Sequence, residues 1–85
     1  MSIMLTQLQT YLREKNITIR PDTINLVEEA MSDLQDMTEQ PLCLEYVVIR
    51  PEGLWVHYLP CGQKGQQTYK IQMDADCLMG ENYEQ

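Results

Sequence analysis

The chain has 85 residues, of which 44% are hydrophobic, and a formal net charge of −7. This length allows one domain around one modest core, and the apolar content is typical of a globular rather than a disordered chain. Contacts with phosphate need Lys and Arg, so the acidic balance argues against direct binding of nucleic acid. No apolar run approaches the roughly 18 residues of a membrane span, and the first residues lack the pattern of a signal peptide. We therefore expect a cytoplasmic protein without a membrane partner.

The first 37 residues predict two amphipathic helices. The first covers about residues 3–15, with Ser2 as its cap and Asn16 as a left-handed stop, and its apolar stripe contains Met4, Leu5, Leu8, Tyr11 and Leu12. After the short β-prone segment 17–20, the second helix covers about residues 22–37. Its apolar half contains Ile24, Leu26, Val27, Ala30, Met31, Leu34 and Met37. Each helix is thus expected to bury one side.

The remaining chain predicts three strands, at residues 42–50, 54–59 and 68–73, joined by a turn at Pro51-Glu52-Gly53 and a polar loop. Short connections make sequential strands neighbours. The expected fold class is α+β: two N-terminal helices packed on one face of a three-stranded antiparallel meander (ααβββ), in a single domain of residues 1–85. For residues 77–85 two alternatives stay open. They form a flexible tail, or they fold over the sheet through Leu78, Met79 and Tyr83.

The register of the first hairpin carries the main functional hypothesis. A three-residue loop with Gly53 at a left-handed bulge position places Arg50 opposite Leu54. The predicted core face then contains Leu42, Leu44, Tyr46, Val48, Leu54, Val56 and Tyr58. The opposite face contains Cys43, Glu45, Val47, Ile49, Trp55, His57 and Leu59. Within it, an exposed apolar patch is expected to bind a partner or a second copy of the chain: Val47, Ile49, Trp55 and His57. The alternative is that the C-terminal residues cover this face.

The second predicted helix also offers an ionic surface. Glu29, Asp33 and Asp36 follow one another at i, i+4 and i+7, so they share one stripe with no Lys or Arg among them. One hypothesis is that this stripe docks on a basic surface of another protein. The alternative is a solvated helix face that keeps a small protein soluble.

The chain contains few residues suited to metal or covalent chemistry. Cys43, Cys61, Cys77 and His57 are its Cys and His residues, and no two cysteines have the Cys-x2-Cys spacing of a zinc knuckle. We interpret the odd cysteine count, without an export signal, as three reduced thiols. No metal, cofactor or catalytic residue is predicted. A metal- or thiol-dependent enzyme using His57 and Cys61 is the hypothesis from a different class.

The segment Ile17-Thr18-Ile19-Arg20-Pro21, followed by an amphipathic helix, resembles the opening strand and helix of ribbon-helix-helix DNA-binding proteins. The resemblance covers about a quarter of the chain. Strands replace the second helix that such a domain requires, and the net charge does not suit DNA. The DNA-binding function is therefore not carried over.

Size and charge together favour a binding protein over an enzyme. We expect a small acidic protein that modulates or inhibits a larger, basic or nucleic-acid-binding protein, by analogy with phage anti-defence, immunity and antitoxin proteins. A phage or mobile-element origin would fit that class. The alternative is a homodimeric structural or regulatory subunit that associates through the sheet face around Trp55.

Overall fold

The computed structural model describes residues 3–62, 68–80 and 83. Its elements in chain order are α1 (Ile3–Glu14), β1 (Ile17–Ile19), α2 (Ile24–Thr38), β2 (Leu42–Arg50), β3 (Gly53–Pro60), β4 (Tyr69–Asp74), the 3₁₀ turn η1 (Ala75–Cys77) and β5 (Leu78–Gly80). Both predicted helices and all three predicted strands are present, so the α+β class is confirmed. The short strands β1 and β5 are additions to the predicted order.

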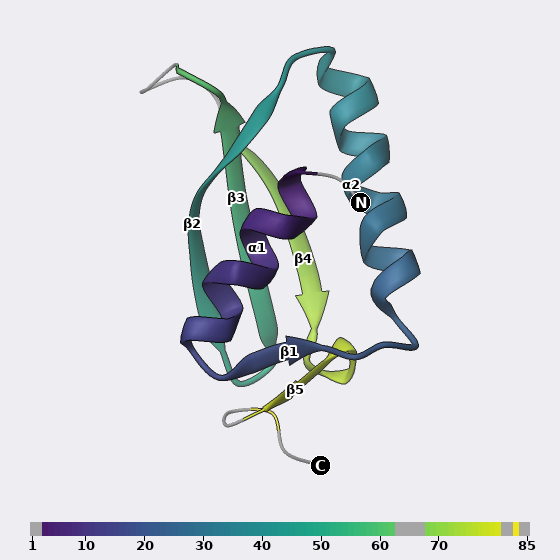
Figure 1. The fold of residues 1–85 in the computed structure, drawn as a ribbon, viewed down its shortest axis with the longest axis vertical. Helices are drawn as coiled ribbons and strands as arrows, with labels where there is room; N and C mark the ends of the chain where they lie inside the picture. Colours follow the sequence, from purple (N-terminus) through teal and green to yellow (C-terminus); the bar gives the residue numbers. More distant parts are fainter. Residues whose placement is uncertain (1–2, 63–67, 81–82, 84–85) are drawn as a thin grey trace.

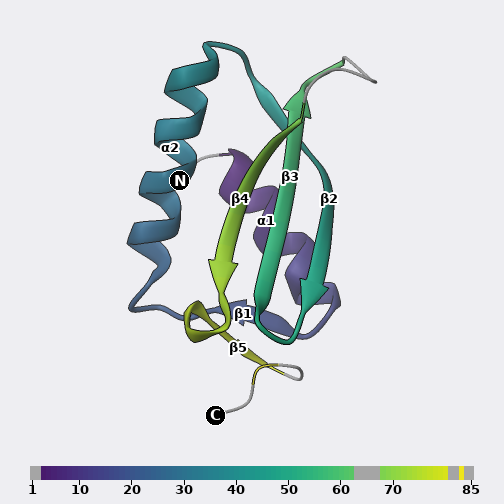
Figure 2. The same ribbon diagram turned by 180° about the vertical axis from the view of Figure 1, so that it is seen from behind.

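The elements form two antiparallel sheets rather than one. Strands β2, β3 and β4 are hydrogen-bonded in that order, as the meander prediction requires. The second sheet pairs β1 with β5, so segments from near both ends of the chain lie side by side (Figure 1). Helix α1 lies across one face of the three-stranded sheet, whereas α2 runs beside the β4 edge (Figures 1 and 2). The ααβββ arrangement, with both helices on one face, is therefore only partly right.

Helix α1 follows its sequence pattern closely. Its apolar stripe is buried at four positions: Met4, Leu5, Leu8 and Leu12. The helix ends before Asn16, which has the expected left-handed conformation with a φ of 61°. Asn tolerates this conformation because its short polar side chain can hydrogen-bond locally. The predicted cap, Ser2, lies outside the described residues.

Helix α2 buries a narrower stripe than its sequence predicts. Val27 and Met31 are its buried residues, while the side chains of Leu26 and Met37 are 66% and 81% exposed. The prediction that Leu26 and Met37 face the core is wrong because α2 contacts α1 and β4 at the sheet edge. A helix at an edge meets neighbours over a smaller arc than one lying on a sheet face. The helix ends at Thr38, where Glu39 has a left-handed φ of 55°.

The C-terminal segment closes one end of the molecule. Leu78–Gly80 pairs with Ile17–Ile19, and Leu78 is fully buried. The Tyr83 hydroxyl donates hydrogen bonds to the carbonyl oxygens of Arg50, at 2.7 Å, and Gly53, at 3.3 Å. The flexible-tail alternative for residues 77–85 is therefore wrong for the described part of that segment, which pairs and packs locally. Residues 81–82 and 84–85 lie outside the described residues.

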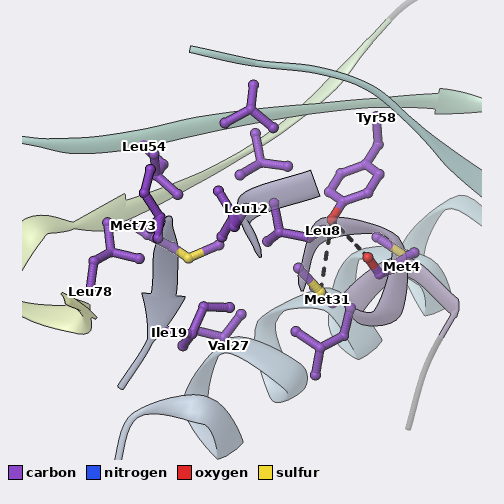
Figure 3. Close-up of a cluster of buried hydrophobic side chains, with 14 of the residues drawn as sticks. Met4, Leu8, Leu12, Ile19, Val27, Met31, Leu54, Tyr58, Met73 and Leu78 are labelled. Carbon is purple, nitrogen blue, oxygen red and sulfur yellow. Dashed lines mark hydrogen bonds between the residues drawn. The ribbon is translucent and has the colours of Figure 1, made fainter. Parts of the chain in front are cut away.

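Tyr58 lies within the core that α1, α2 and the sheet enclose (Figure 3). Its side chain is fully buried, and its hydroxyl donates to the Met4 carbonyl oxygen at 3.4 Å, with the Met31 sulfur at 3.9 Å. Burial raises the pKa of this phenol far above its ordinary value. The predicted inward position of Tyr58 is confirmed.

Candidate functional site

The β2–β3 hairpin has a register one residue away from the predicted one. Arg50 pairs with Gly53 rather than Leu54, so the loop contains only Pro51 and Glu52. Gly53 belongs to β3 and has a φ of 151°, and a Cβ at this position would collide with the Met73 carbonyl oxygen. The glycine thus permits close approach of β3 to β4 rather than forming the loop bulge that the sequence pattern suggested.

This register exchanges the two faces of β2 near the hairpin turn. Val47 pairs with Val56 and Ile49 pairs with Leu54, so both lie on the core face. Val47 is only 9% exposed, and Ile49 packs against the core cluster. The prediction that Val47 and Ile49 share an exposed patch with Trp55 is therefore wrong. A one-residue change of register moves each side chain of a strand to the other face.

A bulge in β2 restores the predicted faces in the N-terminal part of the strand. The register shifts between Leu44, which pairs with Tyr58, and Tyr46, which pairs with His57, so Glu45 is an extra residue. On the N-terminal side of Glu45, Leu42 is buried and Leu44 packs against the core, as predicted. Tyr46 instead points outward and is 47% exposed, contrary to its predicted core position.

We name the resulting surface the outer sheet face, formed on β2 and β3 by Tyr46, Val48, Trp55, His57 and Leu59. On β4, the exposed polar residues Lys70 and Gln72 pair with His57 and Trp55 on the same face. The Tyr46 and His57 rings stack with centroids 4.1 Å apart and an interplanar angle of 16°. The Nδ1 atom of His57 is buried and has no hydrogen-bond partner among the described residues. Both helices lie away from this face (Figure 2). Neither helix covers this face (Figure 2), in which Tyr46 is exposed while Trp55 and His57 are half-buried, and Tyr46 and Val48 occupy it in place of the predicted Val47 and Ile49.

The described C-terminal residues do not cover the outer sheet face. Leu78 and Tyr83 belong to the core cluster, and β5 lies beyond the hairpin end of the sheet (Figure 2). Met79 is 47% exposed. The alternative that Leu78, Met79 and Tyr83 fold over Trp55 is therefore wrong for the residues that the structure describes.

We name a second surface the α2 outer face, formed by Leu26, Glu29, Asp33, Asp36 and Met37, all of them exposed. The three carboxylates share one side of the helix as predicted. Within the described ranges, the ion pair present joins Arg20 to Asp22 at 3.3 Å, and none involves these three acids. Because Leu26 and Met37 lie on the same side, the α2 outer face combines negative charge with large exposed apolar side chains.

An apolar pocket of about 310 Å³ lies between α1, α2 and the start of β2. We name it the Met31 pocket, and its lining consists of Ile3, Met4, Met31, Ser32, Gln35, Pro41, Leu42 and Cys61. Sequence reasoning missed it because its walls come from segments more than 50 residues apart. The helix stripes predicted that Met4 and Met31 are internal, and the predicted core face of the hairpin contained Leu42. Neither pattern predicted a cavity between these elements.

The cysteines differ from their predicted state. Cys43 and Cys61 form a disulfide, with their Cα atoms 5.1 Å apart, and Cys77 is free. The prediction of three reduced thiols is therefore wrong for two of them, because the hairpin brings residues 18 positions apart into bonding distance. Cys61 has no thiol in this state to serve as the nucleophile of the enzyme hypothesis. Across the described ranges, no group of three or more His, Cys, Asp or Glu residues is placed to hold a metal ion.

Comparisons with protein-family models, with curated proteins and with solved structures found no match for this chain. None of the described helices is both long enough and apolar enough to cross a membrane. The outer sheet face, the α2 outer face and the Met31 pocket are therefore the candidate functional features of the described chain.

Proposed function

We propose that this protein binds a larger basic protein through the α2 outer face and thereby modulates or inhibits it. The observation that carries the proposal is the combination of Glu29, Asp33 and Asp36 with the exposed side chains of Leu26 and Met37 on one side of one helix. A partner with Lys or Arg around an apolar centre would complement both features. The proposed mode of action is occupancy of the partner's basic surface, with no chemical step.

The energetics of the isolated helix support this proposal. Like charges at i, i+4 destabilise a helix by a few tenths of a kcal/mol, and here no described basic residue offsets that repulsion. A face that serves only to keep the protein soluble gains nothing from exposing Leu26 and Met37. Bound to a basic partner, the same carboxylates attract rather than repel, and the net charge of −7 accelerates association at low salt.

Charge neutralisation on α2 tests the proposal directly. The test variant is Glu29→Gln/Asp33→Asn/Asp36→Asn. Its matched control, Glu14→Gln/Glu52→Gln/Asp76→Asn, removes three exposed carboxylates from other elements and changes the net charge equally. Each protein is immobilised and exposed to an extract of its source cells at two salt concentrations. A basic protein retained by the wild type and control is then purified and its dissociation constant is measured by calorimetry.

We expect the α2 variant to bind this partner at least about tenfold more weakly, because three exposed ion pairs at about 0.5 kcal/mol each correspond to roughly one decade in affinity. The control variant should retain wild-type affinity. Equal binding by both variants, or retention only of partners without excess basic charge, would overturn the proposal.

A second candidate function, association of two copies through the outer sheet face, is favoured by the exposed ring of Tyr46 and the half-buried rings of Trp55 and His57 on that face. Aromatic side chains are enriched at interface hot spots. Light scattering over a range of concentrations should then give twice the chain mass of 10.0 kDa, and Trp55→Lys should return the mass to that of one chain. A single-chain mass at all concentrations would reject this candidate and leave the α2 proposal unaffected.

A further inference from the structure

The Met31 pocket has an apolar floor and one exposed apolar rim. Met4, Met31 and Leu42 are at most 3% exposed and line it, while Ile3 at its edge is 73% exposed. Its volume of about 310 Å³ lies at the small end of the range for ligand pockets, roughly 300–1,000 Å³. A site of this size suits one bulky aromatic or branched aliphatic side chain better than a whole cofactor.

The wall of the pocket is held by hydrogen bonds between α2 and the start of β2. The Gln35 side-chain amide donates to the Gln40 carbonyl oxygen, and its Oε1 accepts a hydrogen bond from the Leu42 N–H at 3.4 Å. The same side chain therefore ties the end of α2 to the strand that forms the pocket floor. The pocket is thus formed before any ligand binds, which lowers the entropic cost of binding.

Negative charge borders the pocket on its α2 side. Ser32 and Gln35 line the pocket, and none of its lining residues in the described part of the chain is basic. Successive helix residues are 100° apart, so Glu29 and Asp36 lie next to Ser32 around the helix, on the side away from Gln35. Both are exposed. A ligand leaving the pocket over Ser32 would therefore meet carboxylates.

We propose that the Met31 pocket receives one bulky apolar side chain from a basic helical segment of the partner protein, with a Lys or Arg on each side of it. Glu29 and Asp36 are seven positions apart, which corresponds to about 10 Å along α2. A partner helix running along α2 would place cations opposite these two carboxylates if its Lys or Arg residues were at positions −4 and +3 from its apolar anchor. The inference rests on the proposed function, since it specifies how the basic partner is held.

A defined peptide tests the inference without knowledge of the natural partner. The probe is a labelled helical peptide with a leucine anchor and lysines at −4 and +3. One comparison peptide has the anchor replaced by alanine, and another has both lysines replaced by glutamine. The protein variant Ser32→Phe fills the pocket mouth from an exposed position. Its matched control, Asn25→Phe, adds the same ring seven residues earlier on nearly the same side of α2, outside the pocket.

We expect the leucine peptide to bind the wild type and the Asn25→Phe variant equally in fluorescence polarisation. Replacing the anchor, or introducing Ser32→Phe, should weaken binding by about tenfold or more, because burial of one leucine side chain is lost. The glutamine peptide should bind less tightly, with a smaller dependence on salt. Amide chemical shifts should change most at Ile3, Met31 and Leu42.

The outcomes separate this inference from the proposed function. If removal of the α2 carboxylates abolishes binding while anchor replacement and Ser32→Phe have no effect, the pocket inference fails and the proposed function stands. If the glutamine peptide binds as well as the lysine peptide, the pocket accepts apolar ligands without regard to charge, and the basic partner is overturned. Unchanged binding in all peptides and variants overturns both.

Discussion

Alkaline pH should destabilise this protein through the buried phenol of Tyr58. Its side chain is fully buried between α1, α2 and the sheet, with the Met4 carbonyl oxygen and the Met31 sulfur as its hydrogen-bond acceptors (Figure 3). Neither acceptor stabilises a phenolate. Burial is the cause that raises the pKa of Tyr58 above its ordinary value of 10.0. The folded protein therefore retains this proton at a pH where the unfolded chain releases it.

The sign and size of the effect follow from that difference in proton binding. Below about pH 10 the phenol is neutral in both states, and its contribution to the free energy of unfolding is fully present. As the pH rises further, ionisation of the phenol lowers the free energy of the unfolded state. The free energy of unfolding should then fall by about 1.4 kcal/mol per pH unit.

The variant Tyr58→Phe removes the ionising group while keeping the ring. At pH 7 this substitution should lower the free energy of unfolding by about 0.5–1 kcal/mol, a modest loss because the two lost hydrogen bonds are long. At pH 11 the wild type has lost about 1.4 kcal/mol through Tyr58, and the variant has not. The two stability curves should therefore cross between about pH 10 and pH 11. Burial also raises the pKa of Tyr83, but that residue is present in both proteins and cancels in the difference.

Urea unfolding followed by circular dichroism, from pH 7 to 11, measures this crossing. Both proteins carry Cys77→Ala, so that no free thiol attacks the disulfide at high pH. The matched control is Tyr46→Phe, whose 47%-exposed ring remains in contact with water in the folded protein. A Tyr58→Phe difference that stays constant from pH 7 to 11 would refute the reasoning.

Two further predictions concern the hairpin. Gly53→Ala should destabilise the protein by at least about 2 kcal/mol more than Gly62→Ala in urea unfolding, because its Cβ would collide with the backbone of β4 whereas Gly62 faces open space. Equal costs would show that β3 and β4 separate easily. Replacing both Cys43 and Cys61 by alanine should lower the free energy of unfolding by about 3 kcal/mol, since the disulfide closes a loop of 18 residues. An unchanged urea midpoint after reduction of the wild type would contradict this.

Local patterns in the chain predicted the parts of the fold that depend on neighbouring residues. The buried stripe of α1 and its stop at Asn16 follow from helical periodicity and from the conformational tolerance of one residue. The three strands of the meander follow from their composition and short connections. The carboxylates of Glu29, Asp33 and Asp36 share one exposed side because helix geometry alone places them there.

The outer sheet face was only half predictable because register is a property of two strands. The turn sequence is compatible with loops of two or three residues, and the choice decides whether Val47 or Val48 lies beside Trp55. The bulge at Glu45 then exchanges the two faces again in the N-terminal part of β2. Pairing of β1 with β5 was equally hidden, since three-residue strands have too little pattern to predict a partner about 60 positions away.

The sequence by itself therefore determined the class of the fold, the acidic side of α2 and the inward position of Tyr58. Tertiary structure alone decided that α2 lies at the sheet edge, that Leu26 and Met37 remain exposed, that Cys43 meets Cys61, and that a pocket opens beside Met31. The physical reason is the range of the interactions involved. Periodicity and capping act within a few residues, whereas burial, disulfide geometry and cavities depend on segments that only the folded chain brings together.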